Sequence, residues 1–168
     1  TTYTLTASNA LGSTVKAVTV SVAPPLSTQT TAATDDTAAE WVNAATNLEG
    51  LESECGNLSY VGTLPDGDTV IAGVALQGLW ALQEGSDDWA PLGRQGATIR
   101  NRTTSLVQDP ANPGTFWESG AYSGGGVYRT TDGGASFQQL GDISFVDLVS
   151  IDFTDPLRKT LVAGIHEQ

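Results

Sequence analysis

Apolar and polar residues alternate along two short stretches near the start of the chain, residues 3–8 and 17–22. A period of two is the pattern of a strand with one buried face. Between the two stretches the chain reads Asn-Ala-Leu-Gly, and Gly12 supplies the backbone freedom that a turn requires. The pattern predicts a β-hairpin within residues 1–23. Because two strands alone are marginally stable in water, we expect this hairpin to be the end of a larger module.

Residues 24–40 interrupt the strand pattern. Pro24 and Pro25 have no backbone N–H to donate to a sheet. The stretch that follows, residues 26–39, contains a single large apolar residue, Leu26. A polar segment without periodicity is typical of an extended linker. The sequence therefore predicts a linker that separates the hairpin from the region beginning at Trp41.

A repeat of 48 residues organises the rest of the chain. Residues 78–93 align without a gap with residues 126–141, and Trp41, Trp89 and Phe137 recur at the same spacing. Short strands separated by Gly, Asp and Pro turns fit both copies. In the second copy we expect four strands, near residues 104–108, 115–119, 126–130 and 136–140. The fold class predicted for this chain is therefore all-β.

A repeat of this length with four short strands predicts a partial β-propeller. Propeller repeats run to about 40–50 residues per blade, and a closed ring needs about four blades or more. Residues 41–168 hold the last strand of one blade, two whole blades and half of a further one. Because these cannot close a ring, we expect the chain to be a piece of a longer protein.

One turn in the second copy carries a specific motif. Thr130, Asp132, Gly134, Ser136 and Phe137 match the pattern [ST]-x-D-x-G-x-[ST]-[WF], the Asp box, at every defined position. The carboxylate of the aspartate can accept backbone N–H groups within the turn, and the glycine can adopt a positive φ. We expect the aromatic ring to pack inward between neighbouring blades. The motif therefore predicts a structural role for the aspartate rather than a catalytic one.

Two earlier stretches resemble this motif incompletely. The nearer copy keeps Glu84, Ser86 and Trp89 at the aspartate, glycine and aromatic places. The first copy has the residues Thr34, Asp36, Ala38 and Trp41 at the corresponding places. That first match competes with a helical capping box formed by Thr37 and Glu40.

The Asp box resembles the BNR-type repeat of sialidase-like, xyloglucanase-like and sortilin-like β-propellers, and residues 1–23 resemble the end of a bacterial Ig-like or PKD-type module. The first resemblance covers residues 41–168. Together they imply a secreted carbohydrate-active protein, a glycoside hydrolase or a sialidase-like one, whose partner is a glycan or polysaccharide. The alternative is a non-catalytic extracellular propeller used for binding or adhesion, because the fold does not by itself choose the function.

Ligands of such propellers sit on the face formed by the loops that follow the second and fourth strands of each blade. The candidates on this face are Arg100, Arg102, Tyr122, His166 and Glu167. A sialidase-like site needs arginines that clamp a carboxylate, together with a tyrosine nucleophile and a carboxylate partner. The Arg-Ile-Pro element of sialidases is absent, and both arginines have an alternative role as loop residues that balance an acidic surface. The same loops also contain Glu52, Glu54, Arg94, Asp147 and, at a strand end, Glu118.

The charge and composition of the chain limit the classes of partner that we expect it to bind. The formal net charge is −12 and the pI is about 4.1, so phosphate backbones would be repelled and nucleic acid is not expected. His166 is the only histidine and Cys55 the only cysteine, so the sequence predicts neither a metal site nor a cofactor. We expect Cys55 to be a buried thiol. No apolar run reaches the roughly 18 residues of a membrane span, and membrane insertion is not expected.

Overall fold

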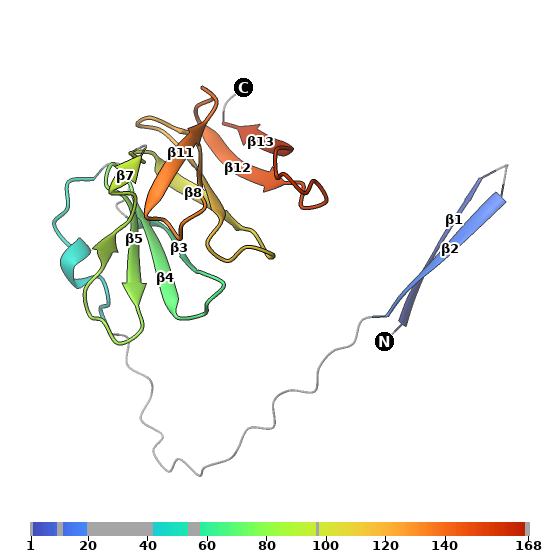
Figure 1. Cartoon of the computed structure of the whole chain (residues 1–168), viewed down its shortest axis with the longest axis horizontal. Helices are drawn as coiled ribbons and strands as arrows, with labels where there is room; N and C mark the ends of the chain where they lie inside the picture. The colour runs from blue at the N-terminus through green and yellow to red at the C-terminus, as the bar shows by residue number, and fades with distance from the viewer. Residues whose placement is uncertain (1, 10–11, 20–41, 54–57, 97, 167–168) are drawn as a thin grey trace, which may run out of the picture. The chain divides into compact units, whose positions relative to one another are not determined.

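The computed structural model describes residues 2–9, 12–19, 42–53, 58–96 and 98–166 (Figure 1). The chain divides into two compact units, Thr1–Trp41 and Val42–Gln168. The described residues of the first unit are all in strands and those of the second are mainly in strands and turns, and over the described ranges the one helical element is the 3₁₀ turn η1, Thr46–Leu48. The fold is therefore all-β, as the repeat predicted. The linker 24–40 lies outside the described residues, as do Thr34, Asp36, Trp41, Glu54, Cys55 and Glu167.

The first unit contains the predicted hairpin. β1 (Thr2–Asn9) pairs antiparallel with β2 (Gly12–Thr19), in a register that runs from Thr2↔Thr19 to Asn9↔Gly12. The second strand begins five residues earlier than the apolar alternation at 17–22 predicted. Pairing continues right up to the turn because backbone hydrogen bonds in a ladder do not depend on side-chain polarity.

The second unit begins with a four-stranded antiparallel sheet in sequential order, formed by β3 (Leu58–Thr63), β4 (Thr69–Val74), β5 (Gly78–Gln83) and β6 (Ala90–Pro91). β6 pairs with β5 over only two residues. It ends at Pro91, whose nitrogen carries no hydrogen to continue the ladder. We refer to these four strands as the first sheet.

The second sheet repeats this arrangement with β8 (Arg102–Gln108), β9 (Phe116–Ala121), β10 (Gly126–Thr130) and β11 (Ser136–Leu140). The four predicted strands are confirmed to within two residues at each end. A short strand from the preceding loop, β7 (Gln95–Gly96), lies parallel to β11 and extends the sheet. A third pair, β12 (Val146–Ile151) and β13 (Leu161–Ile165), follows as an antiparallel two-stranded sheet.

Each glycine that opens the third strand of a sheet lies against the loop before the next one. A Cβ at Gly78 would lie 2.9 Å from the carbonyl oxygen of Ile99, and a Cβ at Gly126 would lie 3.0 Å from that of Ile143. Both glycines have positive φ, 77° and 125°, which side chains rarely allow. The contact from one sheet to the next is therefore repeated along the chain.

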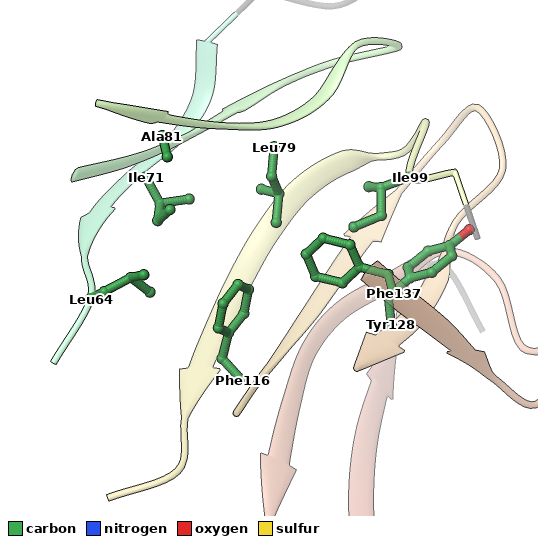
Figure 2. Packing of buried hydrophobic residues seen from close by; sticks show 8 residues of the cluster. All are labelled: Leu64, Ile71, Leu79, Ala81, Ile99, Phe116, Tyr128 and Phe137. Carbon is green, nitrogen blue, oxygen red and sulfur yellow. The ribbon is translucent and has the colours of Figure 1, made fainter. Parts of the chain in front are cut away.

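A shared core fills the space between the first and second sheets. Leu64, Ile71, Leu79 and Ala81 come from the first sheet and its β3–β4 turn, and they meet Phe116, Tyr128 and Phe137 of the second sheet, with Ile99 from the loop between them (Figure 2). The Phe116 and Phe137 rings meet edge to face, with centroids 5.7 Å apart. This confirms that Phe137 packs inward between two successive sheets.

Strand β9 is covered on both faces. Phe116 faces the first sheet, whereas the next residue, Trp117, packs with Val127, Val146 and Val149 against β12. All six residues of β9 are buried. Successive strand residues point to opposite faces, so a strand buried throughout requires a neighbouring layer on each side. The three sheets are therefore adjacent in chain order.

Residues 42–48 form no strand, although the repeat predicted that the last strand of a blade begins at Trp41. The segment instead closes the outer face of the first sheet. The Asn47 side chain accepts a hydrogen bond from Trp89 N at 2.9 Å and donates one to Trp89 O at 2.8 Å. Trp89 Nε1 donates to Ala44 O at 2.7 Å. These bonds to one residue fold the segment into the η1 turn, which buries Leu48.

Candidate functional site

The Asp-box turn joins β10 to β11 through one carboxylate. Asp132 Oδ1 accepts the Thr130 hydroxyl at 2.7 Å and the Ser136 N–H at 2.9 Å, and Oδ2 accepts the Ser136 hydroxyl at 2.6 Å. The Gly134 N–H donates to Thr130 Oγ1 at 3.0 Å, and Gly134 has a φ of 92°. The hydrogen bonds from Ser136, first of all from its hydroxyl, lower the pKa of Asp132 to about 2. The predicted turn chemistry is confirmed.

Replacing Asp132 with alanine is expected to lower the free energy of unfolding by about 1–3 kcal/mol, because hydrogen bonds to an ionised acceptor are lost. The effect should be complete above about pH 4. It should fade as the pH falls toward 2, because a folded-state pKa below the ordinary value contributes stability only to the ionised form. Urea titrations at pH 2.5 and pH 7 measure this difference. Asp142→Ala, at an exposed aspartate in the following loop, is the matched control.

The corresponding turn of the first sheet has a simpler hydrogen-bond pattern. Ser86 Oγ accepts the Asp88 N–H at 3.2 Å and donates to Asp88 O at 3.0 Å. Trp89 occupies the aromatic place and is buried. The aromatic anchor is thus kept in both turns, whereas the aspartate-centred hydrogen bonds are found in the second.

Three of the residues that the sequence placed in the ligand-face loops come together. The Tyr122 hydroxyl lies 3.3 Å from His166 Nε2, and His166 Nδ1 lies 3.1 Å from Asp147 Oδ2 and 3.0 Å from Oδ1. Tyr122 comes from the β9–β10 loop, Asp147 from the start of β12 and His166 from the end of β13. The backbone N–H of His166 also donates to Phe145 O at 2.6 Å. These four residues, Tyr122, Phe145, Asp147 and His166, are called the loop cluster below.

Asp147 occupies a β-bulge that recurs in all three sheets. The register of each first strand shifts around one residue, Ser59 in β3, Thr104 in β8 and Asp147 in β12. The Ser59 and Thr104 hydroxyls donate to the second strand of their own sheets, at Gly73 O (3.3 Å) and Ser119 O (3.1 Å). Asp147 carries a carboxylate at this place and directs it to His166. Bulges commonly re-aim a side chain beside a functional site.

The two candidate arginines do not both lie in one extended segment. Their side chains would point the same way only if residues 100–102 were extended, but Arg100 precedes the strand, Asn101 forms a bend and β8 begins at Arg102. Arg100 is exposed and Arg102 is partly buried. The bend arises because the Asn101 side chain turns into the interior, where its Nδ2 donates to Glu118 Oε2 at 3.2 Å.

The sequence predicted that Glu118 lies at a strand end on the ligand face, and this prediction is wrong. It lies in the middle of β9, on the face toward the first sheet, and is fully buried. Burial raises the pKa of its carboxyl to about 8, so Glu118 is protonated at neutral pH. Two glycines make room nearby, since a Cβ at Gly120 would lie 2.5 Å from Asn101 Cγ and one at Gly73 would lie 2.7 Å from Thr103 Cβ.

A hollow of about 340 Å³ lies at the opposite ends of the sheets from the loop cluster, between the β3–β4 turn and the Asp-box turn. Leu64, Ile71 and Leu92 line it with Asp66. The Asp66 carboxylate accepts the Thr69 hydroxyl at 2.9 Å and its N–H at 3.1 Å. This carboxylate stabilises a turn, so the hollow offers apolar walls and little chemistry.

Within the described ranges, no group of three or more His, Cys, Asp or Glu side chains is arranged to hold a metal ion. No helix in that part of the chain is long and apolar enough to cross a membrane. Comparison with protein-family models gives no match for the chain, and comparison with curated proteins finds no significant relative. The loop cluster, which joins two predicted site residues through side-chain hydrogen bonds, is the candidate functional site.

Proposed function

We propose that residues 41–168 are part of an Asp-box β-propeller in a secreted carbohydrate-active protein of the glycoside hydrolase or sialidase-like class. Residues 1–23 would end an Ig-like or PKD-type module that precedes it. Two four-stranded antiparallel sheets with the same strand order support this architecture. So do the recurring bulge and the recurring glycine contact between sheets.

The Asp-box turn is the observation that carries the proposal. A motif of five defined positions folds into a turn in which each polar member is used, and its aromatic member anchors one sheet on the next. Glycans are the partners that the resemblance implies. The strong negative charge of the chain opposes nucleic acid as an alternative partner.

A non-catalytic binding propeller is the second candidate, and the loop cluster favours it. Glycoside hydrolysis uses two carboxyl groups that both reach the scissile bond. In this chain Asp147 is bonded to His166, and Glu118 is enclosed between sheets. The described residues thus contribute exposed aromatic and polar groups to a surface, as a binding site requires.

Assays of the complete protein distinguish these two functions. It should be assayed for hydrolysis and for binding against a panel of neutral polysaccharides and sialosides. Turnover that is lost when a tyrosine or carboxylate of the ligand face is replaced would establish the hydrolase. Binding without turnover would establish the binding propeller. The absence of both binding and turnover would contradict the carbohydrate assignment.

A further inference from the structure

The loop cluster exposes two aromatic rings that come from different loops. Tyr122 is 38% exposed and Phe145 is 45% exposed, and their rings meet edge to face with centroids 5.9 Å apart. Tyr122 also contacts the His166 ring at 5.8 Å. Aromatic side chains of this size usually contribute to a core. A contiguous exposed group of them on loops marks a surface that binds something apolar on one side.

Both aromatic residues have an unusual backbone conformation. Tyr122 has a φ of 61° and Phe145 a φ of 54°, values that bulky residues rarely adopt. Gly125 lets the two loops approach, since a Cβ there would lie 2.6 Å from Phe145 N. Strained residues of this kind persist where the surrounding structure holds them and gather at ligand sites.

The polar half of the cluster is pre-arranged. An ionised carboxylate can only accept, so His166 Nδ1 donates to Asp147, and His166 Nε2 shares a second hydrogen bond with the Tyr122 hydroxyl. The Asp147 side chain is 46% exposed and that of His166 31% exposed, so both still reach water. The cluster therefore offers an apolar ring surface beside hydrogen-bonding groups fixed by one another. A sugar ring, which has apolar C–H faces and hydroxyls at its rim, matches this combination.

The carboxylate inside the cluster disfavours an acidic sugar. Asp147 is itself anionic, and the chain carries a net charge of −12. Arg100 lies at the border of the cluster, where a Cβ on Gly124 would be 3.9 Å from Arg100 Cβ. Arg158 is held elsewhere by Asp109, with Nε–Oδ2 at 3.0 Å. Asp147 repels a second carboxylate placed beside it, and recognition of a carboxylate typically needs paired guanidinium donors.

From this combination we propose that Tyr122, Phe145, Asp147 and His166 form a subsite for an uncharged sugar ring of a neutral polysaccharide. The proposal rests on the carbohydrate function proposed above and adds the class of sugar and the residues that bind it. The recurring bulge supports it independently, because the place that holds a sheet-stabilising hydroxyl in two sheets holds a histidine-directed carboxylate here.

The test is calorimetric titration of the full chain with neutral xyloglucan and cello-oligosaccharides, and in parallel with sialyllactose. Wild type is expected to bind a neutral ligand and not sialyllactose. Tyr122→Ala and Phe145→Ala are each expected to weaken that binding at least about tenfold, since each removes an aromatic contact worth about 1 kcal/mol together with its buried area. Tyr122→Phe, which keeps the ring, should retain most of the affinity, and Asp147→Asn should lose several-fold.

Val162→Ala, at an exposed apolar residue of β13 outside the cluster, is the control and should bind as wild type does. Thermal melting of each variant confirms that the sheets are intact. Neutral-glycan binding that survives both aromatic substitutions would overturn the subsite while leaving the carbohydrate function standing. Preference for sialyllactose would overturn the neutral class. Binding of none of these glycans would contradict the carbohydrate function and the subsite together.

Discussion

Replacing Phe137 with alanine is expected to lower the free energy of unfolding of the Val42–Gln168 unit by about 3–5 kcal/mol. The ring is buried where the first and second sheets meet, edge to face with Phe116. A Cβ at Gly93 would lie 2.8 Å from the Phe137 ring, and Gly96 lies against the Phe137 backbone. Because Gly93 has no side chain that could move into the space, the cavity left by alanine cannot collapse easily on that side. The substitution should therefore lose both the transfer free energy of the ring and the additional free energy of the cavity.

Urea unfolding followed by tryptophan fluorescence measures this loss. A domain is typically stable by about 5–15 kcal/mol, so the variant should unfold at a much lower urea concentration with a similar slope. Leu157→Ala, at a residue 62% exposed in the β12–β13 turn, removes apolar atoms without opening a cavity and should change stability by less than about 0.5 kcal/mol. If Phe137→Ala cost no more than this control, the two sheets would not share the core described above.

Raising the pH from about 5 to about 9 is expected to destabilise the wild-type protein, and Glu118→Gln is expected to abolish most of that dependence. Burial raises the pKa of Glu118 from its ordinary value of 4.5 to about 8. Between these values the unfolded chain has released the proton while the folded protein still holds it. The unfolded state therefore binds fewer protons, and stability falls as the pH rises. Above about pH 8 the loss levels off, at roughly 3–5 kcal/mol in total.

The measurement is a series of urea midpoints at pH 5, 7 and 9. Glutamine keeps the shape of the side chain and stays neutral. The free energy of unfolding of Glu118→Gln should therefore hardly change with pH in this window, even if it differs from that of wild type. Glu84→Gln, at an exposed glutamate after β5, makes the same chemical change at the surface and should keep the wild-type profile. A Glu118→Gln profile parallel to that of wild type would show that the carboxyl does not carry its proton into the folded interior.

The Asp-box turn could be predicted in detail because its interactions are local. Thr130, Asp132, Gly134 and Ser136 bond to one another within seven residues, and the positive φ falls on the glycine that the motif requires. The strands of the second sheet were predicted for the same reason, since period-two alternation and turn residues act over a few positions. The 48-residue repeat then indicated that the first sheet would have the same strand order.

The candidate site was only half predictable. Tyr122, Asp147 and His166 were all expected in loops of one face, yet nothing in the sequence predicted their mutual contacts, because contacts across 44 and 19 residues depend on how β9, β12 and β13 pack. A comparison of the three first strands could have singled out Asp147, which replaces the hydroxyl residues Ser59 and Thr104. The strand predicted from Trp41 onward is not found in residues 42–48, because Asn47 and Ala44 hydrogen-bond to Trp89 and hold the segment in a turn.

By itself, the sequence of this protein determined the all-β class, the strand positions of the second repeat and the chemistry of the Asp-box turn. Each of these depends on neighbouring residues and on the backbone that they share. Only the tertiary structure decided that Glu118 is enclosed and protonated, that a bend separates Arg100 from Arg102, and that Tyr122, Asp147 and His166 meet. The polarity of a side chain is fixed by its chemistry, but its solvent exposure and partners depend on which sheet packs against it.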